Sequence, residues 1–153
     1  AVARPEIAAA LAKVKTFVDT GQFMAVQAAA VAAFESWEQW VPRNREVFRE
    51  RRDAAVAAFR SAGFTCDPPK ATMYLWIPLP ENLPSAMFAE RLLQDEGVIV
   101  LPGSGFGAGG EGFFRVSFVT SPARITEAAQ RAGRVLQRLT ASSGGKLEKV
   151  GVA

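Results

Sequence analysis

The sequence GVIVLPGSGFGAGGEGFFRVSFV, residues 97–119, decides the fold of this chain. It holds two apolar runs, Val98–Leu101 and Phe113–Val119, joined by a loop rich in glycine. Both runs are short and rich in β-branched or aromatic residues, and Gly97 and Pro102 bound the first, so each predicts a strand. The loop between two strands is where we expect a binding function.

Arg115 is the single charged residue of the second run. Side chains of a strand alternate between its two faces, which places Phe114, Val116 and Phe118 on one face and Arg115 on the other. An arginine on a strand is often a solvated edge residue, but its planar guanidinium also suits bidentate capture of a carboxylate. The residues alone leave both interpretations open.

The glycine loop matches a dinucleotide-binding pattern, since Gly105–Gly110 fits G-x-G-x-x-G. That pattern works where a strand turns into a helix whose N-terminus meets the pyrophosphate, and here the loop leads into a second strand. No Lys-Ser or Lys-Thr follows, as a P-loop requires. We therefore do not expect nucleotide binding, and the glycines indicate either a hairpin turn or a close approach of the backbone to a ligand.

Composition excludes several classes of function. The 153 residues are 49% hydrophobic, which is enough for one globular domain with a core, and the net charge of +3 comes from 18 basic and 15 acidic residues that are interspersed. This pattern gives no continuous basic face for nucleic acid. We expect no membrane span and a cytoplasmic location, because no apolar run approaches the roughly 18 residues that a span needs.

Histidine is absent and Cys66 is the single cysteine. The usual zinc sites and every Ser-His or Cys-His nucleophile pair are thereby excluded, so no metal is expected. Cys66 has no basic neighbour in the sequence that would lower the pKa of its thiol, which favours a structural role.

Apolar periodicity predicts the remaining elements. The predicted helices are Pro5–Val18, Phe23–Trp40, Arg43–Ala62, Ser85–Glu96 and 122–139, and Ala71–Leu79 is a predicted strand. This last strand is apolar on both faces, so we expect it to be central in the sheet. Leu93 is expected to face inward from its helix. The order predicts an α+β fold, with a small sheet of about three strands and helices packed on it.

Three parts follow from this order. Residues 1–40 are helical, with too little sheet to cover, so they look like a remnant of a larger domain and its interface. Residues 41–140 form the compact unit. Residues 141–153 are small and polar, which predicts a flexible tail.

The string from Val98 to Phe118 resembles the closing motif of class I/II, fold-type I aminotransferases, which use pyridoxal phosphate. The overall family fold is α/β. Further segments occur in the family's order: Asp19–Phe23, the arginine-rich stretch 49–52, Pro69–Trp76 and Phe88–Leu93. The pattern is similar to the branch that contains aspartate and LL-diaminopimelate aminotransferases.

This resemblance implies roles for three residues. Arg115 is the arginine that binds the α-carboxylate of an amino-acid substrate, in a reaction that moves an amino group to a 2-oxo acid. Gln22 and Phe23 lie in a segment that the resemblance places at the homodimer interface, where they are candidates for contacting the partner subunit's cofactor site.

The family's Schiff-base lysine lies in a Ser-x-x-Lys motif, and no lysine of this chain has that context. The resemblance therefore implies a C-terminal portion whose cofactor-binding part lies upstream, with no catalytic residue of its own. We expect residues 1–153 alone neither to bind the cofactor covalently nor to transaminate. A non-catalytic α+β binding module, and the equivalent domain of a fold-type I lyase or an aminotransferase-like transcription regulator, remain the alternatives.

Overall fold

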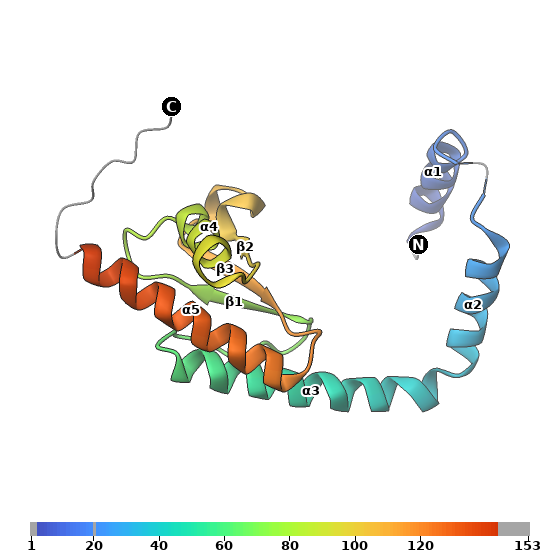
Figure 1. Cartoon of the computed structure of the whole chain (residues 1–153). Helices are drawn as coiled ribbons and strands as arrows, with labels where there is room; N and C mark the ends of the chain where they lie inside the picture. The colour runs from blue at the N-terminus through green and yellow to red at the C-terminus, as the bar shows by residue number, and fades with distance from the viewer. Residues whose placement is uncertain (1–2, 20, 144–153) are drawn as a thin grey trace. The chain divides into compact units, whose positions relative to one another are not determined.

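The computed structural model describes residues 3–19 and 21–143 (Figure 1). The chain consists of two compact units, Ala1–Arg43 and Asn44–Ala153. The elements are helices α1 (Pro5–Lys15), α2 (Met24–Glu35), α3 (Trp37–Ser61), α4 (Ser85–Glu96) and α5 (Pro122–Ser143), strands β1 (Tyr74–Pro78), β2 (Leu101–Pro102) and β3 (Phe113–Ser117), and the 3-10 helices η1 (Gly103–Phe106) and η2 (Ala108–Gly110). In the part of the chain so described, no helix is both long and apolar enough to cross a membrane.

The first unit is built from α1, α2 and the start of α3. Pro5 begins α1 at a position where its missing N–H costs nothing. Neither α1 nor α2 has a buried residue, and large apolar side chains such as Leu11, Met24 and Phe34 are exposed. Apolar helices without a buried face are typical of a segment that packs against a partner.

The break between α2 and α3 was predicted wrongly. The helix predicted as Phe23–Trp40 ends at Glu35, where the Ser36 hydroxyl donates to the Ala32 carbonyl oxygen at 2.7 Å. The next helix begins at Trp37 rather than at Arg43 and contains Pro42. Proline there removes one backbone hydrogen bond near the helix start, whereas the serine competes directly for a helix carbonyl.

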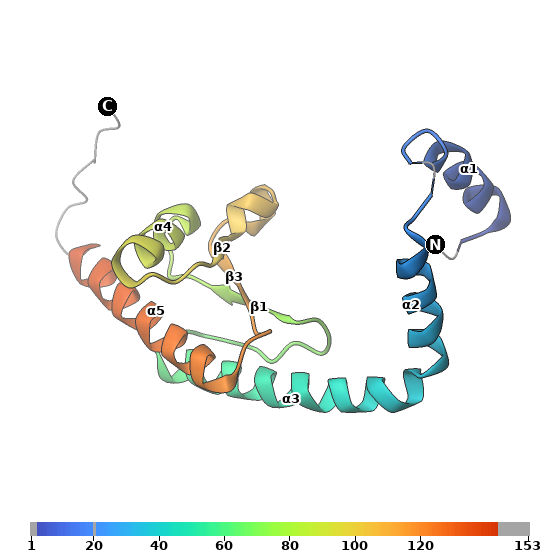
Figure 2. The same cartoon turned by 45° about the vertical axis from the view of Figure 1, so that its right-hand side comes forward.

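The second unit contains an antiparallel sheet in the order β1-β3-β2 (Figures 1 and 2). The predicted α+β class and the three strands are confirmed, but β1 is an edge strand and β3 is central. The error arose because Trp76 makes β1 look apolar on both faces, although this side chain is 41% exposed. The strand predicted as Val98–Leu101 pairs with β3 only at Leu101 and Pro102.

Four phenylalanines form the centre of the core. Phe114 of β3 lies 4.8 Å from Phe88 of α4, 5.3 Å from Phe64 and 6.1 Å from Phe59 of α3, measured between ring centroids. All four rings are at most 5% exposed. The helices therefore cover the face of the sheet that Phe114, Val116 and Phe118 share, as alternation predicted.

Helices α4 and α5 end close to the predicted positions. Gly97 caps α4 with φ 66, as expected for the left-handed position after a helix. Leu93, predicted to face inward, is instead 49% exposed, because Phe88 and Leu92 already fill the buried stripe. Helix α5 continues to Ser143, so residues 141–143 of the predicted tail are helical, and the rest of that prediction, residues 144–153, lies outside the described part.

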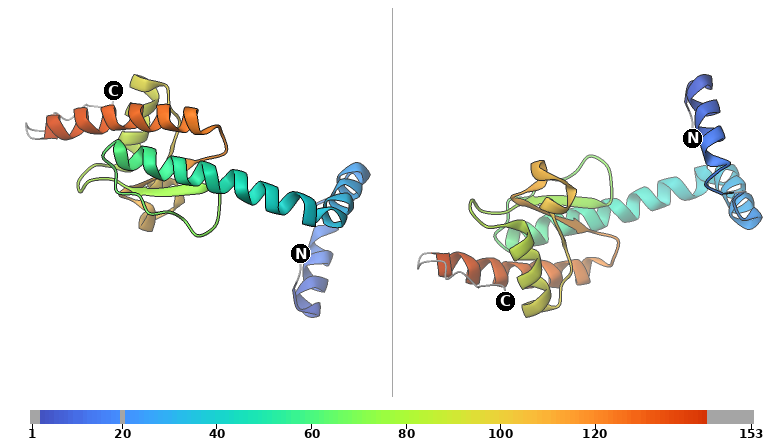
Figure 3. Two further views of the ribbon diagram at one scale, coloured as in Figure 1. Left: turned by 90° about the horizontal axis from the view of Figure 1, so that it is seen from below. Right: turned by 90° about the horizontal axis from the view of Figure 1, so that it is seen from above.

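Gly133 lets α5 approach the end of α3 (Figure 3). A Cβ at this position would lie 2.8 Å from the carbonyl oxygen of Ala62, so a side chain there would force the two segments apart. The same helix buries Ile125, Ala129, Ala132 and Val135 against the core.

A cluster of charges joins the end of α4 to α5. The Glu96 carboxylate accepts hydrogen bonds from Arg134 at 2.5 Å and from Arg138 at 2.8 Å, and Arg131 donates to the Glu96 backbone carbonyl at 2.6 Å. Hydrogen bonds from Arg134, together with those from Arg138 and both positive charges, lower the pKa of Glu96 to about 2.

Replacing Glu96 should make stability depend on pH in a defined way. Its pKa is lowered in the folded state, so its contribution is complete above its ordinary value of 4.5 and is lost as the pH falls toward 2. We expect Glu96→Gln to unfold at a lower temperature than the native chain at pH 7, with the gap closing between pH 4.5 and 2.

Asp95→Asn is the matched control, because the Asp95 carboxylate lies beside Glu96 in the sequence but forms a longer ion pair, 3.7 Å from Arg138. Thermal unfolding followed by circular dichroism at each pH measures both variants. A Glu96→Gln gap that is the same at pH 7 and pH 2, or that equals the Asp95→Asn gap throughout, would contradict this account.

Candidate functional site

Arg115 projects from the middle of β3, the central strand of the sheet. In the register it lies opposite Trp76 of β1 on one side and Leu101 of β2 on the other. Its neighbour Phe114 points into the core, so the guanidinium leaves on the face that the helices do not cover. The predicted direction of Arg115 is thus the observed one.

Two aromatic rings lie against the Arg115 guanidinium. Its Cζ atom is 4.1 Å from the ring centroid of Tyr74 and 4.5 Å from that of Phe106. The two rings come from different elements, Tyr74 from β1 and Phe106 from η1. Both distances are within the range of cation–π attraction. We call Tyr74 and Phe106 the aromatic sandwich.

Trp76 packs beside the aromatic sandwich on the same face of the sheet. Its ring meets Phe106 edge-on at 5.5 Å and stacks on Phe113 at 5.6 Å with an interplanar angle of 20°. Offset and edge-on pairs of this kind each add about 0.5–1.5 kcal/mol beyond burial. Sequence reasoning missed the sandwich, because its members come from β1 and from η1.

No carboxylate of residues 3–19 or 21–143 forms an ion pair or hydrogen bond with Arg115. The side chain is half-buried, with its Cζ atom close to both rings. A guanidinium donates hydrogen bonds in its own plane, so the donors at its edge are available to an anion.

The loop that carries Phe106 is held by two glycines that touch. A Cβ on Gly103 would lie 1.8 Å from the carbonyl oxygen of Gly110, and a Cβ on Gly110 would lie 2.1 Å from that of Gly103. Only glycine fits at either position. The segment 103–110 forms the 3-10 helices η1 and η2 rather than a simple hairpin turn, and it leads into β3.

Glu111 ties this loop to the start of α4. Its carboxylate accepts a hydrogen bond from the Ser85 backbone N–H at 2.7 Å and another from the Ser85 hydroxyl at 3.0 Å. The Ser104 backbone N–H donates to the Ser85 hydroxyl oxygen at 3.2 Å. Hydrogen bonds from the Ser85 and Gly112 backbone lower the pKa of Glu111. We call Glu111, Ser85 and Ser104 the loop latch.

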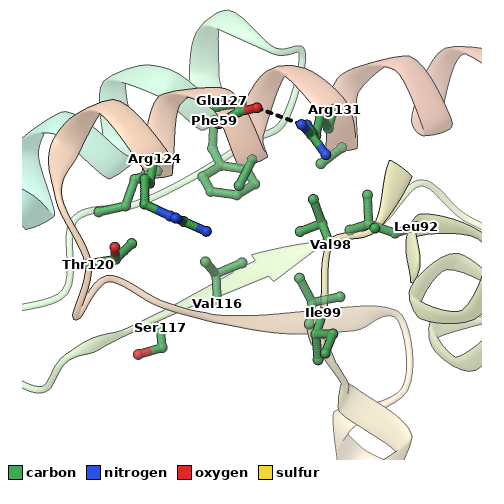
Figure 4. A pocket seen from close by; sticks show the side chains of 15 residues that line it. Phe59, Leu92, Val98, Ile99, Val116, Ser117, Thr120, Arg124, Glu127 and Arg131 are labelled. Atoms are coloured by element: carbon green, nitrogen blue, oxygen red, sulfur yellow. Dashed lines mark hydrogen bonds and ion pairs between the residues drawn. The ribbon is translucent and has the colours of Figure 1, made fainter. Parts of the chain in front are cut away.

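A separate cavity of about 300 Å³ lies on the other side of the sheet (Figure 4). Val116 and Val98 line it together with Arg124 and Arg131 of α5, and Arg131 is paired with Glu127 at 2.5 Å. Arg115 does not line this cavity. The hollow and the predicted site are therefore different places in the second unit.

The other predicted residues have separate environments. Gln22 and Phe23 belong to the first unit, where Phe23 precedes α2 and is 76% exposed, and Gln27 donates to the Gln22 carbonyl at 2.9 Å. Cys66 is buried in the core, and this burial raises the pKa of its thiol. A raised pKa disfavours the thiolate, which is the nucleophilic form.

Comparison with known proteins identifies the family. The aminotransferase class I and II family matches residues 1–131, so the chain belongs to it. An LL-diaminopimelate aminotransferase of Moorella thermoacetica is 42% identical over 139 residues, which are 91% of this chain and 36% of that protein. The chain thus spans about a third of the length of the curated relatives that it matches.

Solved structures agree. The alpha-aminoadipate aminotransferase of Thermus thermophilus, complexed with N-(5'-phosphopyridoxyl)-L-leucine, superposes with a TM-score of 0.84 at 30% identity, over 92% of this chain and 38% of that chain. A probable N-succinyldiaminopimelate aminotransferase from the same species gives a TM-score of 0.77 at 36% identity, over 85% of this chain and 35% of that chain.

The contact between the two glycines predicts a sharp difference between neighbouring substitutions. Gly103→Ala must displace the Gly110 carbonyl, and such overpacking costs typically about 1–3 kcal/mol. Gly105→Ala meets nothing within 4 Å and needs no positive φ, so we expect it to stay within about 0.5 kcal/mol of the native chain. Urea unfolding measures both, and equal stabilities of the two variants would contradict the close approach.

Proposed function

We propose that residues 1–153 are the C-terminal portion of a pyridoxal-phosphate-dependent aminotransferase, and that Arg115 binds the α-carboxylate of its amino-acid and 2-oxo-acid substrates. One observation carries this proposal: the Arg115 guanidinium lies on the uncovered face of the sheet, with no ion-pair partner in the described residues. A half-buried cation without a counter-ion is suited to an anionic ligand.

Carboxylate capture at this position fits the needs of a transaminase. A bidentate pair with Arg115 fixes the orientation of any α-amino acid and makes no contact with its side chain. The same site can therefore accept an amino donor and then a 2-oxo acid. The relatives are named for LL-diaminopimelate, α-aminoadipate and N-succinyldiaminopimelate, and we propose LL-diaminopimelate as the first donor to test.

Pyridoxal phosphate would supply the electron sink for the reaction in the complete enzyme. The residues around Arg115 do not fit covalent attachment of this group, because the sandwich, Trp76 and Leu101 include no amine. Of the lysines described, Lys13 and Lys15 lie in the first unit and Lys70 precedes β1. We propose that residues 1–153 alone do not transaminate.

The first unit would supply an interface. We propose that residues 1–40 belong to the large domain of the complete enzyme and to a homodimer contact, that residues 41–140 are the small domain, and that Gln22 and Phe23 face the partner subunit. Exposure of Phe23, Met24 and Phe34, each more than 70% accessible, supports a covering partner. A cytoplasmic location is proposed with this function.

Cofactor binding can be tested on two proteins. One is residues 1–153, and the other, called here the joined protein, has these residues in place of the matching C-terminal third of the Moorella thermoacetica relative. On titration with pyridoxal phosphate we expect a new absorbance band from the joined protein and none from residues 1–153. A joined protein that binds the cofactor but transfers no amino group would contradict the proposal.

Arg115 is tested in the joined protein. Leaving one partner of a hydrogen-bonded charge pair without its counterpart costs about 2–5 kcal/mol, so we expect Arg115→Ala to lower kcat/KM by about 100-fold or more. Arg115→Lys keeps the charge but loses the bidentate geometry, and an intermediate value is expected.

Leu93→Ala, on the exposed side of α4, is the control for a neutral substitution. Steady-state kinetics with LL-diaminopimelate and 2-oxoglutarate provide the measurement. Retention of kcat/KM within threefold by Arg115→Ala would exclude this arginine as the carboxylate ligand.

A further inference from the structure

We propose that Tyr74 and Phe106 are positioning residues that hold the Arg115 guanidinium in one plane, so that a substrate carboxylate can pair with it only at its edge. The inference rests on the proposed function, because it assigns a role to the surroundings of the same arginine. It concerns residues that touch Arg115 rather than the reacting atoms.

The geometry limits how an anion can approach. The Arg115 Cζ lies 4.1 Å from the Tyr74 centroid and 4.5 Å from the Phe106 centroid, with one ring supplied by β1 and the other by η1. Each ring occupies space beside the guanidinium that an anion cannot then enter. The N–H groups at its edge remain, and a fork of two parallel hydrogen bonds to a carboxylate forms in that plane.

The aromatic sandwich also lowers the conformational entropy that Arg115 would lose when a substrate binds. A free arginine side chain samples many rotamers, and a substrate would otherwise have to order it on binding. Two cation–π contacts restrict the side chain before the ligand arrives. Binding energy is therefore not spent on ordering Arg115.

Phe106 is held in place although it comes from a loop. The contact of Gly103 with Gly110 fixes the path of η1 and η2, and the loop latch ties Glu111 and Ser104 to the buried Ser85. Trp76 then meets the Phe106 ring at 5.5 Å from the neighbouring strand. These contacts give a structural reason for a glycine-rich loop at this place, because the loop holds the Phe106 ring against the Arg115 guanidinium.

The first test uses residues 1–153 as they are. Protons above aromatic rings shift upfield in NMR spectra, so we expect the Arg115 Nε–H resonance, assigned with Arg115→Lys, to be upfield of the other arginines. Phe106→Leu and Tyr74→Leu should each reduce this shift by about half, because each removes one of two rings. A resonance that neither substitution moves would overturn the sandwich.

The second test measures affinity in the joined protein. We expect Phe106→Leu and Tyr74→Leu each to raise KM for the amino acid about tenfold, the scale of one lost cation–π contact and its ordering, with kcat changed less than threefold. An amino acid with a methyl group in place of its α-hydrogen binds without reacting, and its Kd should rise by the same factor. Phe106→Tyr and Tyr74→Phe keep the aromatic faces and should rescue both values.

The outcomes separate this inference from the proposed function. If Arg115→Ala lowers kcat/KM but both leucine variants keep KM and Kd within twofold, the sandwich has no positioning role while the carboxylate ligand stands. If Arg115→Ala also has no effect, the proposed function fails and this inference fails with it. A merely structural role would have a different result. The leucine variant would then lower kcat by as large a factor as it raises KM, and Phe106→Tyr or Tyr74→Phe at the same position would not restore either value.

Discussion

The packing of Phe114 against Phe59, Phe64 and Phe88 is the interaction on which the rest of the second unit depends. It joins the central strand to α3, α4 and the segment between α3 and β1. Because neighbouring residues of a strand point in opposite directions, burying Phe114 forces Arg115 to the other face. The aim of the guanidinium is therefore set by the hydrophobic core, which is the most rigid part of the unit.

The glycine loop extends this rigidity to the open face of the sheet. Six glycines at 103–112 would by themselves predict a flexible segment. Instead, Gly103 and Gly110 lie so close that neither could carry a side chain, and Glu111 is bonded to the start of α4. Gly103 and Gly110 thus serve the packing of the loop on itself, whereas Gly105 has open space around it.

Sequence periodicity predicted most of the helices and strands and the direction of Arg115, because strand alternation and helix caps depend on residues only a few positions apart. Ser85–Glu96 with Gly97 as its cap is observed as predicted. The edge position of β1 could not be predicted, because strand order depends on pairing with β3, about forty residues later in the chain. The bond between Glu111 and Ser85 spans 26 residues and the aromatic sandwich joins two elements, so neither leaves a local signal.

Arg115 has no carboxylate partner within residues 3–19 and 21–143. Two carboxylates, Glu96 and Glu111, lie at or within the stretch of sequence that contains it, and both have other partners. Glu96 is occupied by Arg134 and Arg138, and Glu111 is occupied by Ser85 and Gly112. Both have lowered pKa values, so they stay ionised and bonded to these donors at neutral pH. The loop latch therefore uses both oxygens of the Glu111 carboxylate for hydrogen bonds from Ser85 and Gly112, and the contacts of Arg115 are with the rings of Tyr74 and Phe106 instead of a carboxylate.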